Sequence, residues 1–257
     1  MDLVALPAFG DNYIWMLHDG ARAWVVDPGD AAPVHSALDA RGLELAGILV
    51  THHHADHVGG IDALRTRLAP GAAVHGPARE PIAEPFVPHA DGDVVALLGR
   101  RFEVLEVPGH TAGHVAYLQR DAAAPLLFAG DTLFSAGCGR LFEGTPAQMA
   151  ASLARLAALP ADTRLCCAHE YTLANLRFAA AVEPDNAALA AHRARCEALR
   201  AAGRPTLPSV LGLELEINPF LRCRAPQVVA SARAQGATDD DAVSVFTALR
   251  EWKNRFR

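Results

Sequence analysis

The sequence predicts an α/β protein, in the α+β sense, whose sheets are covered by helices on their outer faces. Over the first 170 residues, short apolar runs alternate with turn residues, and helical patterns lie between them. These strands follow no strict βαβ order, which suggests sheets with helices packed outside them. After residue 170 the sequence becomes rich in Ala, Leu and Arg and helix-like. We therefore expect a domain over residues 1–170 and a smaller helical domain over residues 171–257.

The first part of the chain holds most of the expected strands and three expected helices. The predicted strands are Leu3–Leu6, Tyr13–Leu17, Trp24–Val26, Leu45–Val50, Phe102–Val107, Val115–Leu118, Leu126–Ala129 and Arg164–Ala168. Leu45–Val50 has no polar face, which is typical of a strand buried on both sides. Ala32–Arg41, Ile61–Leu68 and Pro146–Leu159 are predicted helices, and Thr145 is the expected N-cap of the last.

The second part of the chain is predicted to be almost entirely helical. The expected helices are Leu173–Val182, Asn186–Ala202, Pro226–Gln235 and Asp240–Arg255. Acidic residues at 239–241 precede the last helix, and its far end is basic, as the helix dipole prefers. Leu213–Ile217 carries the one strand signal in this part.

Composition and charge exclude several classes of protein. Hydrophobic residues make up 51% and charged residues 20% of the 257 positions, so a disordered or fibrous chain is excluded. The net charge is 23 − 29 = −6, which argues against a nucleic-acid partner. No stretch approaches the roughly 20 apolar residues of a membrane span. The N-terminal residues lack the basic region of a signal peptide, so we expect a cytoplasmic protein with no membrane partner.

The five cysteines fit a reducing compartment. Their number is odd, and their spacing forms no disulfide framework. Cys166 and Cys167 lie on a predicted buried strand, where small apolar side chains are expected. Cys138 lies in a glycine-rich turn with no His or Asp beside it, so a structural role is favoured over a nucleophilic one.

A cluster of histidines and one aspartate follows the strand Leu45–Val50. His52 and His54 are two residues apart in an extended segment, so both side chains point to the same side and can reach one ion. Asp56 and His57 lie at the turn into the next helix and project in another direction, where they can serve a second ion. His53 points away from this pair, and we expect it to pack or to support a ligand.

Three further strands also end in residues that can bind a metal. The strand Phe102–Val107 is followed by His110, Leu126–Ala129 by Asp131, and Arg164–Ala168 by His169. Functional residues of α/β proteins gather beyond the carboxyl ends of strands. The four strand ends together supply enough donors for two metal ions. His114 could also be a ligand, but a supporting role is favoured.

These donors specify the kind of metal site. Imidazole nitrogens and carboxylate oxygens suit Zn²⁺ and also Fe or Mn, whereas the absence of thiolates argues against a structural zinc site. Two divalent ions bring four positive charges. Asp56, a bridging Asp131 and a metal-bridging hydroxide would offset three of them. Such a hydroxide forms near neutral pH because coordination lowers the pKa of water to about 7.

The pattern His52-x-His54-x-Asp56-His57, followed by His110, Asp131 and His169, resembles the metallo-β-lactamase superfamily. That resemblance implies an αββα sandwich. The chain is similar, more narrowly, to the glyoxalase II (hydroxyacylglutathione hydrolase) family. The stretches that carry this similarity are Asp11–Trp15, Thr51–Gly60, Gly109–His114, Gly130–Phe134, Gly137–Arg140, His169–Thr172 and Asn218–Arg222.

The resemblance implies a role for each candidate site residue. His52, His54 and His110 would hold one metal, Asp56, His57 and His169 the other, and Asp131 would bridge the two. Glutathione recognition would fall on Arg140, Tyr171, Arg250 and Lys253, with Phe142 beside them. Animal members tend to have tyrosine at the position of Phe142, so a phenolic contact to the tripeptide is in doubt here. Arg250 and Lys253 share a helix face, as a clamp for the carboxylates of glutathione requires.

The implied activity is hydrolysis of S-(2-hydroxyacyl)glutathione, such as S-D-lactoylglutathione, to a 2-hydroxy acid such as D-lactate and free glutathione. This is the second step of methylglyoxal detoxification. Two Zn²⁺ ions and a monomer are expected. The alternatives are another enzyme of the same fold, either a mono-iron sulfur dioxygenase or a lactonase, and a non-catalytic binding protein. A single metal per chain would favour the sulfur dioxygenase. Missing metal ligands would favour the binding protein, but none of the expected ligands is missing from the sequence.

Overall fold

The computed structural model describes residues 1–121 and 123–256. By their internal contacts these residues form two compact units, which are treated separately below. Unit 1 comprises Met1–Glu106 and Ala112–Gly130, and unit 2 comprises Val107–Thr111 and Asp131–Arg257. The predicted division at residue 170 stays a prediction. None of the described helices is long and apolar enough to cross a membrane.

Unit 1 contains the larger part of the strands. They are β1 (Asp2–Ala8), β2 (Asn12–His18), β3 (Arg22–Val26), β4 (Glu44–Leu49), β5 (Val74–Pro77), β6 (Val87–His89), β7 (Val94–Leu97), β8 (Arg100–Glu106), β9 (Val115–Gln119) and β10 (Leu126–Gly130). Strands β1 to β6 form one sheet in chain order, antiparallel from β1 to β3 and parallel from β3 to β6. Strands β7 to β10 belong to a second sheet and pair antiparallel.

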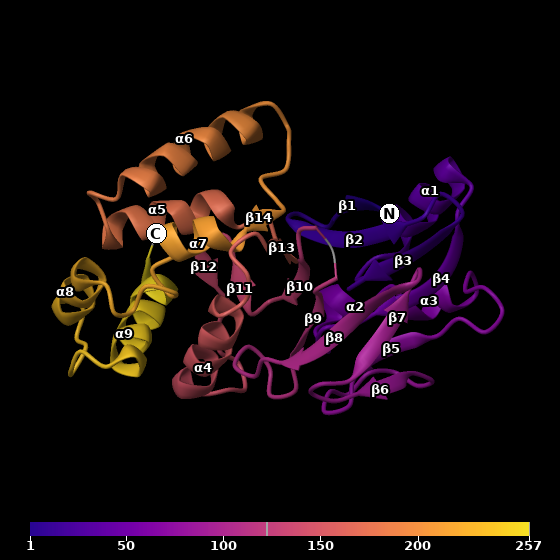
Figure 1. The fold of residues 1–257 in the computed structure, drawn as a ribbon, viewed down its shortest axis with the longest axis horizontal. Coiled ribbons are helices and arrows are strands. Elements are labelled where there is room, and N and C mark those ends of the chain that lie inside the picture. The colour runs from indigo at the N-terminus through magenta and orange to yellow at the C-terminus, as the bar shows by residue number, and fades with distance from the viewer. Residues whose placement is uncertain (122, 257) are drawn as a thin grey trace. The chain divides into compact units, whose positions relative to one another are not determined.

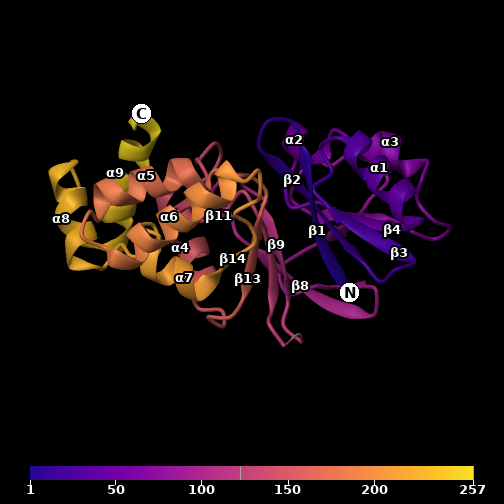
Figure 2. The same cartoon turned by 90° about the horizontal axis from the view of Figure 1, so that it is seen from above.

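The helices of unit 1 are α1 (Ala31–Arg41), α2 (Ala55–Val58) and α3 (Ile61–Arg65). Helices α1 and α3 lie together over β3 and β4 (Figure 2). The core beneath them includes Val34 and Leu38 of α1, Leu64 of α3 and Ile48 of β4. The predicted helix after Gly60 ends at Arg65 and is therefore shorter than expected.

A buried tyrosine connects the two sheets of unit 1. Tyr117 of β9 is fully buried, and its hydroxyl donates a hydrogen bond to the carbonyl of Val50, just after β4, at 2.8 Å. Burial raises the pKa of Tyr117 well above its usual value, so the hydroxyl keeps its proton. The end of β4, where the first ligand cluster begins, is therefore fixed to the opposite sheet.

Unit 2 is mostly helical. Its elements are β11 (Leu133–Phe134), β12 (Gly137–Cys138), α4 (Pro146–Ala157), β13 (Arg164–Cys167), α5 (Thr172–Val182), α6 (Ala187–Ala201), β14 (Ser209–Val210), α7 (Leu211–Ile217), α8 (Pro226–Ala234) and α9 (Ala242–Arg255) (Figure 1). Strands β11 and β12 form a hairpin, and β13 pairs antiparallel with β14. Helix α4 starts as predicted, because Thr145 and Gln148 form a capping box.

One element of unit 2 corrects the sequence analysis. Leu213–Ile217 was expected to be a strand, and that prediction is wrong, because the segment lies in helix α7. Leu213, Leu215 and Ile217 alternate with acidic residues, and this spacing is typical of a strand. Leu211, Glu214 and Ile217 are buried at a spacing of three residues instead, which is helical.

Candidate metal centre

The loop after β4 carries the first pair of predicted ligands. The chain leaves β4 at Leu49 and reaches α2 at Ala55, and His52 and His54 lie between them. His52 Nε2 and His54 Nδ1 are 3.1 Å apart. Two nitrogens that bind one Zn²⁺ at ~2.0–2.1 Å in tetrahedral geometry lie about 3.3 Å apart. The two rings therefore have the spacing of ligands that share one cation.

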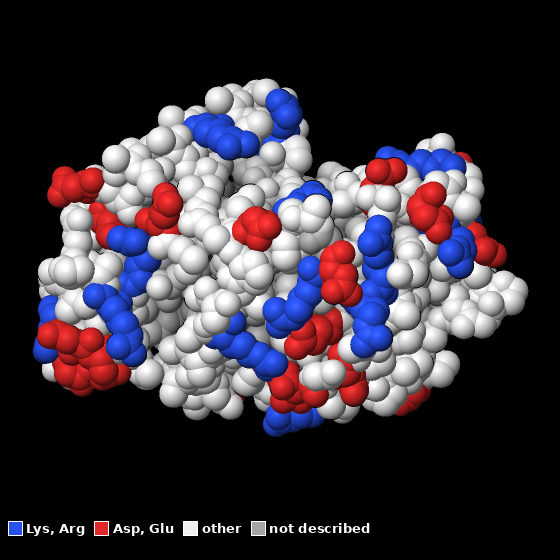
Figure 3. All heavy atoms as spheres, viewed as in Figure 1, with Lys and Arg blue, Asp and Glu red and all other residues white. Residues whose placement is uncertain are grey.

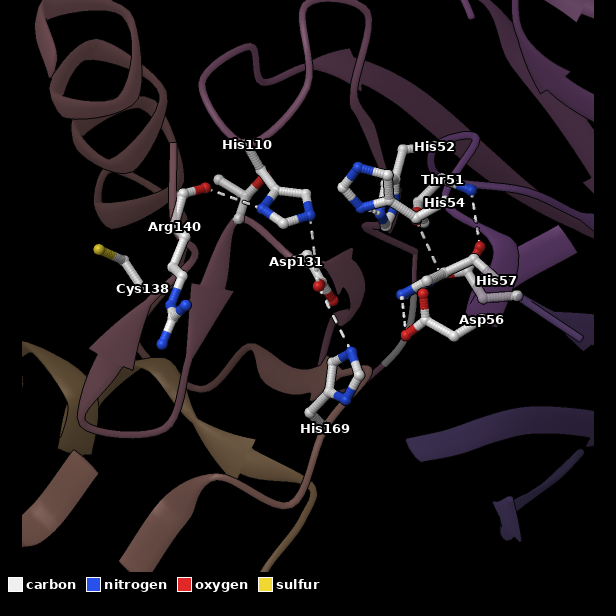
Figure 4. A network of polar contacts seen from close by, with 12 residues as sticks. Thr51, His52, His54, Asp56, His57, His110, Asp131, Cys138, Arg140 and His169 are labelled. Atoms are coloured by element: carbon white, nitrogen blue, oxygen red, sulfur yellow. Dashed lines mark hydrogen bonds and ion pairs between the residues drawn. The ribbon is translucent and has the colours of Figure 1, made fainter. Parts of the chain in front are cut away.

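Helix α2 carries the second pair of predicted ligands. Asp56 lies in its first turn, and His57 is fully buried. His57 Nε2 lies 3.5 Å from Asp56 Oδ2. The rings of His52 and His57 are 4.1 Å apart between centroids, and both offer nitrogens within 4.8 Å of each other. Unit 1 thus brings all four of its predicted ligands into one cluster (Figure 4).

Two residues that the sequence analysis did not single out orient this cluster. The carboxylate of Asp27 accepts hydrogen bonds from the Thr51 backbone N–H at 2.7 Å and from its hydroxyl at 2.8 Å. Asp27 Oδ2 also lies 3.2 Å from His57 Nδ1. Asn12 donates through Nδ2 to Asp56 Oδ2 at 2.9 Å. Hydrogen bonds of this kind fix the orientation of ligands before a metal binds.

His53 and His114 make the supporting contacts expected of them. His53 pairs through its ring and its backbone N–H with Glu80, whose other oxygen accepts from the Gly113 N–H at 2.7 Å. His114 is fully buried and stacks on His52 with ring centroids 4.7 Å apart. Glu80 is a further residue that no sequence motif indicated.

Unit 2 brings together its three predicted ligands around one carboxylate oxygen. Asp131 Oδ2 lies 3.4 Å from His110 Nε2 and 3.4 Å from His169 Nε2 (Figure 4). Both distances exceed the usual 2.7–3.2 Å of a hydrogen bond from a ring nitrogen. They are close to the spacing of about 3.3 Å between ligands of one ion. The equidistant oxygen is thus where a carboxylate that serves two ions would be.

The turn after β12 orients His110. His110 Nδ1 donates to the carbonyl oxygen of Arg140 at 2.8 Å. Because a carbonyl can only accept, the proton is on Nδ1, and the Nε2 lone pair faces Asp131. The side chain of Arg140 is exposed beyond this backbone contact. The residue therefore orients His110 with its backbone and leaves its guanidinium at the surface.

Two aromatic side chains of unit 2 lie against these histidines. Tyr171 stacks flat on His169, with ring centroids 4.6 Å apart and an interplanar angle of 4°. Phe142 is 63% exposed and meets the ring of His110 edge-on at 5.3 Å. An exposed aromatic ring beside a ligand is available to a substrate.

Arg250 and Lys253 lie on one face of α9, as their spacing predicts, but they have different surroundings. Arg250 is only 4% exposed, and its Nη1 donates to the carbonyl of Cys138 at 2.9 Å. Lys253 Nζ donates to the carbonyl of Ala174 at 3.0 Å and lies 5.3 Å from the ring centre of Phe178. Burial, and then the charge of Arg250, lower the pKa of Lys253 to about 8.

Two other buried groups of unit 2, Cys138 and Glu214, have raised pKa values. Burial raises the pKa of the Cys138 thiol, against the charge of Arg250, so the thiol stays protonated. Glu214 is fully buried and accepts from the Ser135 hydroxyl at 2.8 Å and from the Ala136 N–H at 2.7 Å. Burial raises the pKa of Glu214 against these hydrogen bonds.

Two family models divide the chain between them. Residues 8–169 match the metallo-beta-lactamase superfamily, and residues 170–256 match the C-terminal part of hydroxyacylglutathione hydrolase. A hydroxyacylglutathione hydrolase of Albidiferax ferrireducens is 60% identical over 257 residues and covers all of both chains. The chain belongs to the hydroxyacylglutathione hydrolase family of the metallo-beta-lactamase superfamily.

A second relative and two solved structures are also similar to this chain over most of its length. The hydroxyacylglutathione hydrolase of Cupriavidus taiwanensis is 56% identical and covers 98% of each chain. Among solved structures, ETHE1 from Myxococcus xanthus is 27% identical with a TM-score of 0.65, covering 88% of this chain and 86% of its own. TTHA1623, solved in a di-iron-bound form, is 28% identical with a TM-score of 0.60, covering 86% of this chain and all of its own.

These findings confirm several predictions of the sequence analysis. The superfamily, the glyoxalase II branch, the α/β fold with a helical C-terminal region and the assignment as a thioester hydrolase are all confirmed. The superfamily fold together with the His and Asp clusters suits a binuclear metal centre.

Proposed function

We propose that this chain hydrolyses S-D-lactoylglutathione and related S-(2-hydroxyacyl)glutathione thioesters, with two divalent metal ions bound to the His and Asp clusters. The products are a 2-hydroxy acid and glutathione, which corresponds to the second step of methylglyoxal detoxification. The main support is the position of Asp131 Oδ2 at 3.4 Å from both His110 and His169, in a chain that matches the family over its whole length.

The proposed ligand sets follow the family pattern. Three histidines would hold one ion, two histidines and one carboxylate would hold the other, and a second carboxylate would serve both. The first set is His52, His54 and His110, the second is Asp56, His57 and His169, and the bridge is Asp131. The donors fit such ions because all are imidazoles or carboxylates and those of unit 1 are already oriented by Asp27 and Asn12.

When bound, two such ions polarise a carbonyl oxygen and lower the pKa of a water molecule to about 7. The remaining steps depend on the chain itself. The carboxylates Asp56 and Asp131 offset the positive charge of the centre, and the Arg140 carbonyl keeps His110 in the tautomer whose Nε2 is a donor to metal. The leaving thiol has a pKa near 8.5, so it departs as a thiolate without a strong general acid.

Substrate binding is assigned to the residues around the end of α9. Arg140, Arg250 and Lys253 supply positive charge for the carboxylates of glutathione, and Tyr171 and Phe142 supply aromatic surface beside His169 and His110. Phenylalanine at 142 provides apolar contact only. Because these groups bind a part of the substrate remote from the thioester, their joint replacement, as in R250A/K253A, should raise KM more than it lowers kcat.

Metal content and hydrolysis, measured together, test the proposal. Purified protein should contain two equivalents of metal, with Zn²⁺ as the expected ion, and should hydrolyse S-D-lactoylglutathione. Asp131→Asn keeps the size of the side chain but removes its charge. It should lower the metal content and reduce kcat/KM by more than about 100-fold. Asp62→Asn is the matched control, because Asp62 is exposed and, among residues 1–121 and 123–256, forms an ion pair with Arg65 alone.

Other results would contradict the proposal. One metal per chain in a fully active protein, or an Asp131→Asn variant with normal metal content and normal turnover, would remove the basis for a bridging carboxylate.

We also propose that the protein is located in the cytoplasm and is a monomer. All five cysteines are free, as a reducing compartment requires. The face seen in Figure 3 mixes acidic and basic side chains, which fits a small-molecule substrate better than a nucleic acid.

A further inference from the structure

A buried carboxylate to which the proposed function gives no role lies beside the His and Asp cluster of unit 1. The side chain of Glu80 is only 1% exposed. Burial of a carboxylate at such depth is costly unless donors surround it. Donors to Glu80 come from two separate loops of unit 1, and each loop carries histidines of the cluster.

The first loop follows β4 and contains the predicted ligands His52 and His54. His53 lies between them, and its backbone N–H donates to Glu80 Oε2 at 3.0 Å. The ring of His53 pairs with the same oxygen through Nδ1. The donating peptide group joins His52 to His53 and is planar, so this hydrogen bond fixes the backbone from which the ligand side chains extend.

The second loop precedes β9 and contains His114. The backbone N–H of Gly113 donates to Glu80 Oε1 at 2.7 Å. The next residue, His114, is fully buried, and its ring stacks on His52 with ring centroids 4.7 Å apart. The ring that packs on His52 therefore belongs to a loop that is bound to the same carboxylate as the loop of His52.

The parallel strands β4 and β5 bring Glu80 to this position. The N–H of Val50 donates to the carbonyl of His75 at 2.8 Å, so the carboxyl ends of the two strands lie together. Glu80 follows the end of β5, and its own N–H donates to the carbonyl of Pro77 at 3.3 Å. Ile82, two residues later, is buried in the core of unit 1. The backbone is thus held on both sides of Glu80.

The close approach of the second loop requires a glycine at position 113. A Cβ atom there would lie 2.7 Å from the backbone oxygen of Arg79 and 2.8 Å from Glu80 Oε1. Real Cβ contacts are essentially never closer than 3.0 Å. Because Gly113 has no side chain, its N–H can reach the carboxylate.

We propose that Glu80 is a positioning residue for the metal centre, which joins the loop of His52 and His54 to the loop of His114 and thereby sets the affinity for the ion that these ligands bind. This inference rests on the proposed function, since it concerns a metal ion proposed there. A carboxylate is required because each of its oxygens accepts from a different loop. An amide offers one acceptor, and its NH₂ group would face an N–H donor.

Zinc binding to the apoprotein tests this role without turnover. The metal is removed with a chelator, and Zn²⁺ is titrated back in competition with a chromophoric chelator. Glu80→Gln should lower the affinity for Zn²⁺ about 10- to 100-fold, which is the range for groups that orient metal ligands. Glu80→Asp keeps the charge but shortens the side chain by one methylene group. It can hold one loop at most, so it should also lower the affinity about 10-fold or more.

Glu183→Gln is the matched control. Glu183 is 3% exposed, ends helix α5 and pairs with Arg222 at 2.8 and 2.9 Å. The same substitution at this position should lower the urea midpoint of the apoprotein and leave the affinity for Zn²⁺ unchanged. It therefore measures what the loss of a buried carboxylate does to folding alone.

Steady-state kinetics give a second readout. With S-D-lactoylglutathione and saturating Zn²⁺, Glu80→Gln should lower kcat and leave KM nearly unchanged. The residues proposed to bind glutathione belong to unit 2, and the substitution removes none of their contacts. A rise in KM with unchanged kcat would contradict a role in positioning the metal ligands.

Failure of this inference can be distinguished from failure of the proposed function. If the wild type binds no Zn²⁺ or does not hydrolyse S-D-lactoylglutathione, the proposed function is refuted. If the wild type does both, but the Glu80 variants bind Zn²⁺ with wild-type affinity, the role of Glu80 alone is refuted, and a lowered urea midpoint would then assign Glu80 to folding. If the Glu80 variants do not fold, Gly113→Ala decides by the same criteria, because it displaces the second loop and leaves the carboxylate in place.

Discussion

Replacement of Gly139 by alanine should disable the ligand cluster of unit 2 without removing any ligand. A Cβ atom at Gly139 would lie 1.9 Å from the backbone oxygen of Asp131 and 3.2 Å from His110 Nδ1. Real Cβ contacts are essentially never closer than 3.0 Å, so the Asp131 oxygen or the turn must move by at least 3.0 − 1.9 = 1.1 Å. A misplacement of about 1 Å at a catalytic group costs on the order of 100-fold in rate.

The assay is kcat/KM for S-D-lactoylglutathione together with metal content per chain. Gly139→Ala should lower kcat/KM by about 100-fold or more, because the carboxylate of Asp131 and the ring of His110 lose their common geometry. Gly10→Ala is the matched control. A Cβ at Gly10 meets no atom within 4 Å, and its backbone is not left-handed, so the same chemical change should leave both measurements unaltered.

A clear result would refute this reasoning. If Gly139→Ala retains two metals and a kcat/KM within about threefold of the wild type, the turn accommodates a methyl group, and the position of Asp131 does not depend on it. Equal losses in the Gly139→Ala and Gly10→Ala variants would also refute it, because the effect would then not come from the close contact.

Two other predictions concern stability and pH. Glu214→Ala leaves the Ser135 hydroxyl and the Ala136 N–H without their buried acceptor, and should lower the free energy of unfolding by about 3 kcal/mol in chemical denaturation, whereas Glu216→Ala, at an exposed position, should change it little. Lys253 loses its charge as the pH rises through about 8, so KM for S-D-lactoylglutathione should increase above that pH. Lys253→Arg should remove this increase between pH 7 and 9.5, and an unchanged profile would show that Lys253 does not bind the substrate as a cation.

The candidate donors of the two His and Asp clusters could be selected from the sequence because their signal is local. His52 and His54 share a side of one extended segment, and His110, Asp131 and His169 each follow an apolar run that reads as a strand. Neither inference needs knowledge of distant parts of the chain.

The groups that orient those donors were not predictable for the opposite reason. Asp27 lies 24 residues before Thr51, and in the sequence it belongs to an Asp-Pro-Gly turn, which explains it fully. Asn12 lies 44 residues before Asp56. Their carboxylate and amide meet the cluster only because β1 to β4 are neighbours in one sheet, and strand neighbours are not encoded in any short motif.

Burial also separated residues that the sequence treats as equivalent. Arg250 and Lys253 are both cations on one face of α9, and their spacing predicts a common role. The spacing does not show how deeply each side chain is buried. Arg250 donates to the carbonyl of Cys138 in β12, whereas Lys253 donates to the carbonyl of Ala174 in α5, the helix that follows Tyr171.

The turn from Gly137 to Arg140 connects these roles. Three of its carbonyls accept a side-chain hydrogen bond: Asn218 donates to Gly137, Arg250 donates to Cys138, and His110 donates to Arg140. Arg250, which we propose to bind glutathione, and the proposed metal ligand His110 are thus both bound to the backbone of residues 137–140. The exposed guanidinium of Arg140 leaves the turn at the same place. If glutathione binds where we propose, it lies beside the segment that fixes the tautomer of His110, so the same turn serves proposed substrate binding and ligand orientation.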